Sequence, residues 1–503
     1  MGELEAVIDV TESVLDRLES NDDVAYAEVG GVARRATDAV VTAEEVRSAS
    51  DVAETGVWWR LFADGAADYR YTTSFDANHL DTLVEKSVRS GRLLGQETPA
   101  KYDRGTVHRA THPGWARRPV ESGHSTDEES LDAIDAAEKA ETVGTALERA
   151  VADLDAERTR ATYRDETVES VLLTTTGSAV NTTVERASVE PTVVPETGTK
   201  RGGHVGATTG AAFLDSLSER LANVVGRAAD AESASALPSR TPEPGRRTVA
   251  VGPRAAAELF HHLAHYLEID AVYFGSSPYR IGDRIGPDAL SMADEVPAGS
   301  WAARAYDAEG RPTQSASLVA GGVVRNHVYD SAAAIREEAF PAGNLVPSLG
   351  FDRPPRVHAR HLRVESGTAT ASERRSGATA SVERVGSPHV VNEATRTKRT
   401  SGMPPSLLYA RDIGETTPAE FDAEASNQRL RFPVVEGYAL DGGERVARLS
   451  DAALEVELAD FETLDAFGAR TETVTGTCTK HKSTLPYAVT APGVRLSARV
   501  LRE

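Results

Sequence analysis

The sequence predicts an α+β fold in two domains, each rich in antiparallel sheet. Segments with helical spacing of apolar residues alternate with strand-like runs of β-branched and aromatic residues on both sides of one polar stretch. Asp64–Gly65 stands between two strand-like runs, which is a hairpin signature. The stretch 229–247 is rich in Ala, Ser, Pro and charge and is the candidate linker. We therefore predict domains over 1–228 and 248–503.

Local patterns predict the elements of the N-terminal domain in order. The chain opens with an amphipathic helix, and two strand-rich segments follow over 24–75. Asp76 is the expected N-cap of a helix that stops at Gly95. A polar loop over 104–129 and a long helix over 132–157 come next, before further strands.

The C-terminal domain is expected to be mainly strands. A short strand precedes a helix that contains three histidines, and strand-like segments then continue to the C-terminus. The polar stretch 366–402 has few apolar residues and is expected to form a long loop or irregular strands.

The composition indicates a salt-adapted protein, as in halophiles. The formal net charge is -22, from 77 acidic against 55 basic residues, and only seven of the basic residues are lysine. A surface rich in carboxylates holds water and cations and keeps a protein soluble in strong salt. The same charge repels phosphate backbones, so we expect no direct binding of nucleic acid.

The sequence also predicts the compartment. Cys478 is the single cysteine, which excludes an intramolecular disulfide and a CxxC zinc site. The first twenty residues have acids where a signal peptide has bases, and no apolar run reaches membrane-spanning length. We expect a soluble cytoplasmic protein with no membrane partner.

One predicted helix has an unusual concentration of histidines. In the stretch 258–270, successive residues turn by about 100°, so Leu259 and Leu263 share an apolar face. His261 and His265 lie on the other side, four residues apart. That spacing lets two imidazoles reach one zinc ion. A solvated polar face without metal has the same pattern, so the motif alone leaves both interpretations open.

A zinc peptidase also needs a carboxylate that takes a proton from the attacking water. In the HExxH motif this carboxylate belongs to the residue after the first histidine. Here the residue after His261 is His262, and the nearby carboxylates of Glu258 and Glu268 are displaced along the helix. These two glutamates are the candidate bases if the site is catalytic.

The segments after this helix resemble the TldD/PmbA (TldE) family. The matching residues are Arg280–Gly282 in a GxRIG-like turn, Asp307, Glu309–Gly310 and Pro312–Thr313 in a DxEGxPT-like stretch, and Gly321–Gly322 in a glycine turn. Cys478 and the strand after it resemble the family's C-terminal segment. The resemblance is strongest over 250–330 and 434–495, and it is not traced over 366–426.

This resemblance implies a TldD/PmbA-like fold and a cytoplasmic zinc-dependent peptidase, built from two related subunits and acting on peptides or small unfolded proteins. The TldD-type subunit has an HExxxH motif on this helix and a cysteine ligand near its C-terminus. The PmbA/TldE-type subunit lacks the histidine motif. In an alignment with that motif, Phe260 falls on the first histidine, His261 on the glutamate and His265 on the second histidine. Cys478 falls on the cysteine, and the helix is more similar to the PmbA type.

Two hypotheses for function follow from these observations. In the first, the chain is the non-catalytic PmbA/TldE-like partner of a TldD-type homologue, because one ligand and the base are absent. A missing base removes roughly 10²–10⁴-fold in rate. In the second, His261, His265 and Cys478 bind zinc in an active, remodelled site. Glu258 or Glu268 would then act as base.

The resemblance also implies an oligomer, formed by this chain with itself or with a homologue. A third hypothesis, a gyrase-associated regulator that contacts DNA, is opposed by the net charge of -22 and by the lack of a basic stripe.

Overall fold

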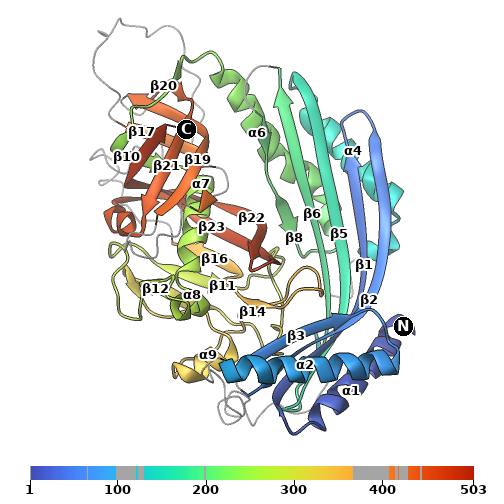
Figure 1. Ribbon diagram of the computed structural model, residues 1–503. Coiled ribbons are helices and arrows are strands. Elements are labelled where there is room, and N and C mark those ends of the chain that lie inside the picture. The colour runs from blue at the N-terminus through green and yellow to red at the C-terminus, as the bar shows by residue number, and fades with distance from the viewer. Residues whose placement is uncertain are drawn as a thin grey trace, which may run out of the picture.

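The computed structural model describes residues 2–64, 66–97, 120–122, 130–196, 200–365, 407–413, 417–418, 429–441 and 444–502. The predicted α+β class is confirmed, because helices pack against two large and mainly antiparallel sheets, one in each half of the chain (Figure 1). No helix among these residues is long and apolar enough to cross a membrane.

The N-terminal sheet is built on four long strands that stand side by side (Figure 1). Its strands are β1 (Val24–Val41), β2 (Val46–Ala63), β3 (Ala66–Thr72), β4 (Val120–Ser122), β5 (Ala156–Thr174), β6 (Ala179–Pro195), β7 (Arg201–Gly202) and β8 (Val205–Ala207). The main path runs β3-β2-β1-β5-β6-β4. β2 and β3 form the predicted hairpin, in which Ala63 pairs with Ala66 across Asp64, and Gly65 lies outside the described residues.

The alternation of side chains along β2 separates the two faces of this sheet. Trp59 and Leu61 are buried in a core shared with the first two helices. Trp58, the residue before Trp59, belongs to the core of the C-terminal half. Because successive side chains point to opposite faces of a strand, one sequence stretch supplies both cores.

Helices cover the N-terminal sheet at both ends of its strands. They are α1 (Gly2–Glu19), α2 (Ala77–Glu97), η1 (Leu131–Ala133), α4 (Ala136–Val151), α5 (Ala212–Asp215) and α6 (Leu217–Ala234). α1 and α2 share one core with β1 and β2, whereas α4 and α6 share another with β5 and β6.

Two predicted helices differ in extent from the structure. Asp76 accepts the N–H of His79 at 2.9 Å, as expected of an N-cap, but α2 continues past Gly95. A glycine inside a helix costs only about 1 kcal/mol relative to alanine, so it does not have to end one. The helix predicted over 132–157 is shorter, because α4 begins after the Asp135 cap and β5 takes its last residues.

The C-terminal half contains the second sheet and the histidine helix. Its elements are β9 (Ser239–Arg240), β10 (Gly245–Val251), α7 (Pro253–His265), α8 (Ile269–Tyr273), β11 (Met292–Glu295), β12 (Ala316–Ala320), β13 (Val323–Val324), α9 (Ser331–Arg336), β14 (Leu345–Val346), β15 (Arg356–Val357), β16 (His361–Val364), β17 (Leu407–Ile413), β18 (Thr417–Pro418), β19 (Arg429–Asp441), β20 (Glu444–Leu449), β21 (Ala452–Glu457), η4 (Leu458–Thr463), β22 (Ala466–Lys480) and β23 (Ser483–Arg502). β23 is central, since it pairs with β10, β16, β21 and β22.

The segment predicted as a linker, 229–247, holds regular structure over part of its length. It includes the end of α6, all of β9 and the start of β10. α6 extends this far because Ala228, Ala231 and Ala234 are buried on one of its faces. The division into two domains at this segment stays a prediction. The polar stretch 366–402 lies outside the described residues, as does the predicted polar loop apart from β4.

A buried group of charges joins the two halves. We call Glu28, Arg60, Glu309 and Ser331 the interface cluster. Arg60 donates to both oxygens of Glu28 and, at 3.0 Å, to Glu309. The other oxygen of Glu309 accepts the N–H and the hydroxyl of Ser331. The cluster therefore ties β1 and β2 to the DxEGxPT-like stretch in the C-terminal half.

Candidate metal centre

The apolar face of the histidine helix is the one that the sequence predicts. α7 starts with Pro253. Proline is favoured at this position because an N–H group in the first turn of a helix has no intrahelical partner. Leu259 and Leu263 are buried in the C-terminal core. Phe260 is fully buried and packs beside Phe461, with ring centroids 6.0 Å apart. It therefore acts as a core residue.

The opposite face of α7 is not solvated, because the helix packs against β22 and β23. His261 is only 6% exposed. Its ring stacks on Tyr487 of β23, with centroids 3.9 Å apart and planes at 21°. The Tyr487 hydroxyl donates to Glu258 one turn earlier on the helix, at 3.2 Å. His262 packs beside Phe432, with ring centroids 5.5 Å apart.

Glu268, just after α7, orients two histidines. One of its oxygens accepts from His265 Nδ1 at 3.0 Å, and the other accepts from His358 Nδ1 at 2.7 Å. Lys480 Nζ donates to the same carboxylate at 2.6 Å. Because Nδ1 of each imidazole is used in this way, its Nε2 atom is left to face the other side. The two rings stack in parallel, with centroids 5.3 Å apart.

Cys478 lies on β22 at the other side of these imidazoles. Its Sγ is 3.5 Å from Nε2 of His265. Burial alone would raise the pKa of the thiol, but the hydrogen bond with His265 and the nearby His358 outweigh it and lower the pKa to about 6. The cysteine is therefore favoured as a thiolate, which is the form that binds metals.

The pKa values of His265 and His261 are shifted in opposite directions by burial and neighbouring charges. Burial alone would lower the pKa of His265, but the charge of Glu268 and the hydrogen bond to Cys478 raise the pKa to about 10. Burial and the neighbouring histidines hold the pKa of His261 well below its usual value, so this ring is neutral. His261 thus keeps a lone pair for a ligand.

The donor atoms of these residues converge. Within the described residues, one group of atoms within 4.8 Å of one another comes from His261, His358 and Cys478, and a second comes from His265, Glu268 and His358. The structure thus brings together the predicted His261, His265 and Cys478. We call these three residues and His358 the donor cluster. Of the two candidate bases, Glu268 is tied to the histidines, and Glu258 bonds to Tyr487.

His358 is the site residue that the sequence analysis did not identify. It lies between β15 and β16, 97 residues after His261, so no helical or metal-ligand spacing connects the two. The nearest local signal is a second histidine, His361, three residues later. That residue does not join the site, because its ring bonds to Ser300 and Thr490.

The residues present fit a metal ion. His358 is buried, and its Nε2 atom has no hydrogen-bond partner among the described residues. A buried nitrogen without a partner is costly unless a ligand completes it. Imidazole nitrogens with one thiolate form a donor set typical of zinc-class transition metals. The carboxylate of Glu268 behind two of the imidazoles is the usual arrangement for holding ligand rings in place.

Comparison with known proteins agrees with this chemistry. Residues 244–397 match the family model described as the PmbA/TldA metallopeptidase C-terminal domain. A metalloprotease of Methanothermobacter thermautotrophicus is 23% identical over 344 residues, which cover 67% of this chain and 71% of that protein. The predicted resemblance to the TldD/PmbA family is confirmed at the level of the C-terminal domain.

Solved structures share the fold over nearly the whole chain. TldE from Thermococcus kodakarensis has a TM-score of 0.65 and 13% identity, covering 98% of this chain and 99% of that one. A candidate modulator of DNA gyrase from Bacteroides thetaiotaomicron has a TM-score of 0.66 and 14% identity, with 99% of both chains covered. A similar candidate modulator from Thermotoga maritima has a TM-score of 0.65 and 17% identity, with 97% and 100% covered. At these identities the likeness shows the fold alone.

Proposed function

We propose, from the PmbA/TldA-type C-terminal domain over residues 244–397, that this chain is a metal-binding, non-hydrolytic subunit of a TldD/PmbA-type metallopeptidase system. The system would act in the cytoplasm on peptides or small unfolded proteins. Its partner would be a TldD-type homologue with an intact HExxxH motif, or a second copy of this chain. The observation that carries the proposal is that, in the described part of the chain, the carboxylate grouped with the donor atoms, Glu268, has both oxygens occupied by hydrogen bonds.

The engagement of Glu268 supports the non-hydrolytic role. Among the described residues, it is the one carboxylate in the two groups of donor atoms. Both of its oxygens accept hydrogen bonds, from His265, His358 and Lys480. A general base needs an oxygen within reach of the proton that it takes. Glu268 instead fixes the imidazole rings.

The number of donors also supports this role. His261, His358 and Cys478 form one group of three donor atoms, and Nε2 of His265, 3.5 Å from Cys478 Sγ, would have to move into that group to complete a closed tetrahedral zinc site. Catalytic sites usually have three protein ligands and keep one position open. Zinc would supply a Lewis acid that polarises a carbonyl. A site closed by four protein donors has no position for that carbonyl, so we expect the ion to brace α7 against β22.

A second function is favoured by one observation. His261, His358 and Cys478 form a three-donor group by themselves, and Tyr487 links His261 to Glu258 by stacking and a hydrogen bond. If those three residues were the ligands, Glu258 would be the base of an active metallopeptidase. Tyr487 could donate a hydrogen bond, because burial raises the pKa of its hydroxyl and keeps it protonated.

Metal content and peptidase activity together separate the two functions. The zinc-loaded protein is incubated with short unfolded peptides in concentrated salt, alone and with an HExxxH-bearing homologue. We expect one equivalent of zinc, no turnover by the chain alone, and activity only with the homologue. Turnover by the chain alone that disappears with a chelator and in Glu258→Gln would overturn the non-hydrolytic role. Glu243→Gln, at an exposed position just before β10, is a control for the change of charge.

A further inference from the structure

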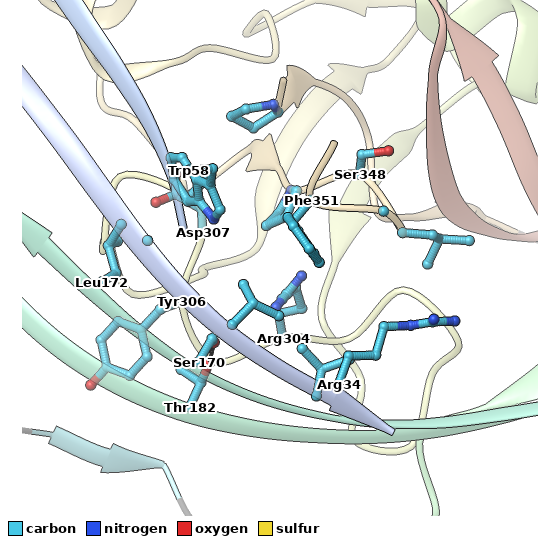
Figure 2. A pocket seen from close by; sticks show the side chains of 18 of the residues that line it. Arg34, Trp58, Ser170, Leu172, Thr182, Arg304, Tyr306, Asp307, Ser348 and Phe351 are labelled. Atoms are coloured by element: carbon cyan, nitrogen blue, oxygen red, sulfur yellow. Dashed lines mark hydrogen bonds between the residues drawn. The ribbon is translucent and has the colours of Figure 1, made fainter. Parts of the chain in front are cut away.

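A second pocket lies where the two halves of the molecule meet. Strands β1, β2, β5 and β6 form one wall, and the loops 304–308 and 347–355 of the C-terminal half form the other (Figure 2). The cavity between them has a volume of about 80 Å³ and opens to solvent. None of the donor cluster lines it, so it is a separate site.

The charge of this pocket is opposite in sign to that of the chain. Its charged lining residues are Arg34, Arg186, Arg304, Arg353, Glu166 and Asp307. Four cations thus face two carboxylates, in a protein with 77 acidic and 55 basic residues. A concave surface with an excess of one sign of charge raises the local concentration of the opposite ion. The pocket is therefore suited to an anion.

Glu166 is shared between two of the arginines. Arg34 Nε donates to it at 2.6 Å, and Arg186 Nε lies 3.2 Å from its other oxygen. Arg353 is half-exposed and pairs with Asp352 at 3.3 Å. These three guanidinium groups each have a carboxylate within the protein.

Arg304 is different. In the part of the chain that the structure describes, no residue forms a hydrogen bond or an ion pair with its guanidinium, which lies among Arg34, Tyr306 and Phe351 in the view of Figure 2. Burial and the charge of Arg186 lower the pKa of Arg304 to about 9. A partly buried cation without a counter-ion is unfavourable until an anion completes it.

Asp307 does not fill that role, although it lines the same pocket. One of its oxygens accepts the N–H groups of Glu309 and Arg311, both at 2.9 Å. The other lies 3.3 Å from the N–H of Leu345. Both oxygens of the carboxylate thus accept backbone N–H groups, and these bonds hold the DxEGxPT-like turn.

An apolar wall stands beside the arginines. Trp58 and Tyr69 stack with ring centroids 5.8 Å apart, and the Tyr69 hydroxyl donates to the carbonyl of Phe351 at 2.6 Å. Leu172 and Val180 continue this surface. The aromatic rings are thus fixed in place before any ligand arrives, which lowers the entropy lost on binding.

We propose that this pocket binds a carboxylate attached to an apolar or aromatic group. Arg304 would hold the carboxylate through its planar fork of N–H donors, which matches two carboxylate oxygens. The apolar group would pack on Trp58 and Phe351. Two sources have this chemistry, namely the C-terminal residue of a peptide and a small organic acid.

The position of the pocket is compatible with a peptide. Pro355 lines it, and His358 of the donor cluster follows three residues later. An extended chain spans at most about 3.6 Å per residue, so these two backbone positions lie within about 11 Å. The proposal does not depend on the metal centre or on hydrolysis, and it can be tested with the metal removed.

Titration calorimetry in KCl tests the proposal with three probes. They are 3-phenylpropanoate, the tripeptide Ala-Ala-Phe, and the same tripeptide with a C-terminal amide. We expect both carboxylates to bind and the amide to bind at least 10-fold more weakly. Tighter binding of the tripeptide than of 3-phenylpropanoate identifies a peptide terminus as the source, and equal binding identifies a small acid. Equal binding of the acid and amide forms, or no binding at millimolar concentration, overturns the proposal.

Variants at Arg304 connect that binding to the pocket. Removing a charged hydrogen-bond donor should weaken carboxylate binding by about 10-fold to 100-fold in Arg304→Gln. Arg304→Lys, which keeps the charge without the fork, should lose part of this affinity. Arg363→Gln makes the same change of charge at a half-exposed site on β16 and should bind as the native protein does. Native affinity in Arg304→Gln would refute the assignment, and its melting temperature should not fall, because the guanidinium has no partner to lose.

Discussion

Glu268 and Glu309 are both buried carboxylates in the C-terminal half, 0% and 7% exposed, and both are surrounded by cations or hydrogen-bond donors. Glu309 belongs to the interface cluster, where Arg60 bridges it to Glu28. Glu268 lies behind the donor cluster, where it holds His265 and His358.

The two carboxylates differ in whether their hydrogen-bond partners have a further atom that is available to a ligand. Every carboxylate oxygen of the interface cluster accepts a hydrogen bond from Arg60 or Ser331. Two of the partners of Glu268 are imidazoles with a second nitrogen, and Nε2 of His358 has no hydrogen-bond partner among the described residues. In the interface cluster all carboxylate oxygens have partners, so the cluster can serve only to hold the two halves together. In the donor cluster one imidazole nitrogen remains available to bind a ligand.

Removing the thiolate of Cys478 should give the largest difference between the two clusters. In Cys478→Ser the metal loses its sulfur ligand, and we expect the purified protein to retain no stoichiometric zinc, because a neutral hydroxyl is a poor ligand. Elemental analysis after gel filtration measures this directly. Arg60→Met in the interface cluster is the matched control and should keep its full zinc content. Zinc retained in Cys478→Ser would remove the thiolate from the ligand set.

The reverse result is expected for stability. Arg60→Met leaves the carboxylates of Glu28 and Glu309 buried without their shared cation, which costs about 3–5 kcal/mol. At roughly 2–4 °C per kcal/mol, the melting temperature should fall by about 6–20 °C. Arg70→Met, on the neighbouring strand β3, removes a part-exposed pair with Asp68 and should cost no more than about 1 kcal/mol. Equal losses in the two variants would contradict a structural role for the interface cluster.

More residues of the donor cluster than of the interface cluster can be predicted from the sequence. Helical spacing places His261 and His265 on one face of α7, because that arrangement depends only on the local backbone. Cys478 could be identified through the family resemblance, since nothing in its neighbours indicates a ligand. His358 could not, because the position of the segment between β15 and β16 near α7 is set by the packing of β16 on β23 and on α7.

The polar face of α7 shows the same limit. A helix face with histidine and glutamate looks solvated in the sequence, and only the sheet of β22 and β23 above it buries His261. The interface cluster is also a product of tertiary structure. Arg60 and Glu309 are 249 residues apart in the chain, and their pairing depends on how the two halves meet.

A smaller effect on metal binding should follow from the carboxylate that orients the imidazoles. Glu268→Gln keeps the shape of the side chain but offers one acceptor oxygen in place of two. Changes to such supporting residues typically cost 10-fold to 100-fold in metal affinity. Asp270→Asn is a matched control, because Asp270 also accepts a hydrogen bond from Lys480, whereas His265 and His358 bond to Glu268. Competition with a zinc chelator gives both affinities, and an unchanged affinity in Glu268→Gln would show that the rings need no support.

The smallest expected effect is a pH dependence that comes from the charges near the interface cluster. Burial and the charge of Glu309 raise the pKa of Asp307 to about 7 in the folded protein. Burial likewise raises the pKa of Glu28 to about 7. Between about pH 4 and pH 7 the folded state therefore holds more protons than the unfolded chain, so the free energy of unfolding falls as pH rises. Each group contributes at most about 1.4 kcal/mol per pH unit.

Asp307→Asn should remove part of this slope, because Glu28 and Asp330, whose pKa burial raises to about 6, still titrate. An amide oxygen can still accept the N–H groups of Glu309 and Arg311. Melting temperatures at several pH values from 5 to 7, at constant salt, measure the slope in both proteins. Asp307 lies outside the donor cluster, so zinc content at a given pH should be the same in Asp307→Asn and the native protein. An unchanged slope in Asp307→Asn would mean that this carboxylate is already ionised at pH 5, and that its three backbone N–H contacts outweigh its burial.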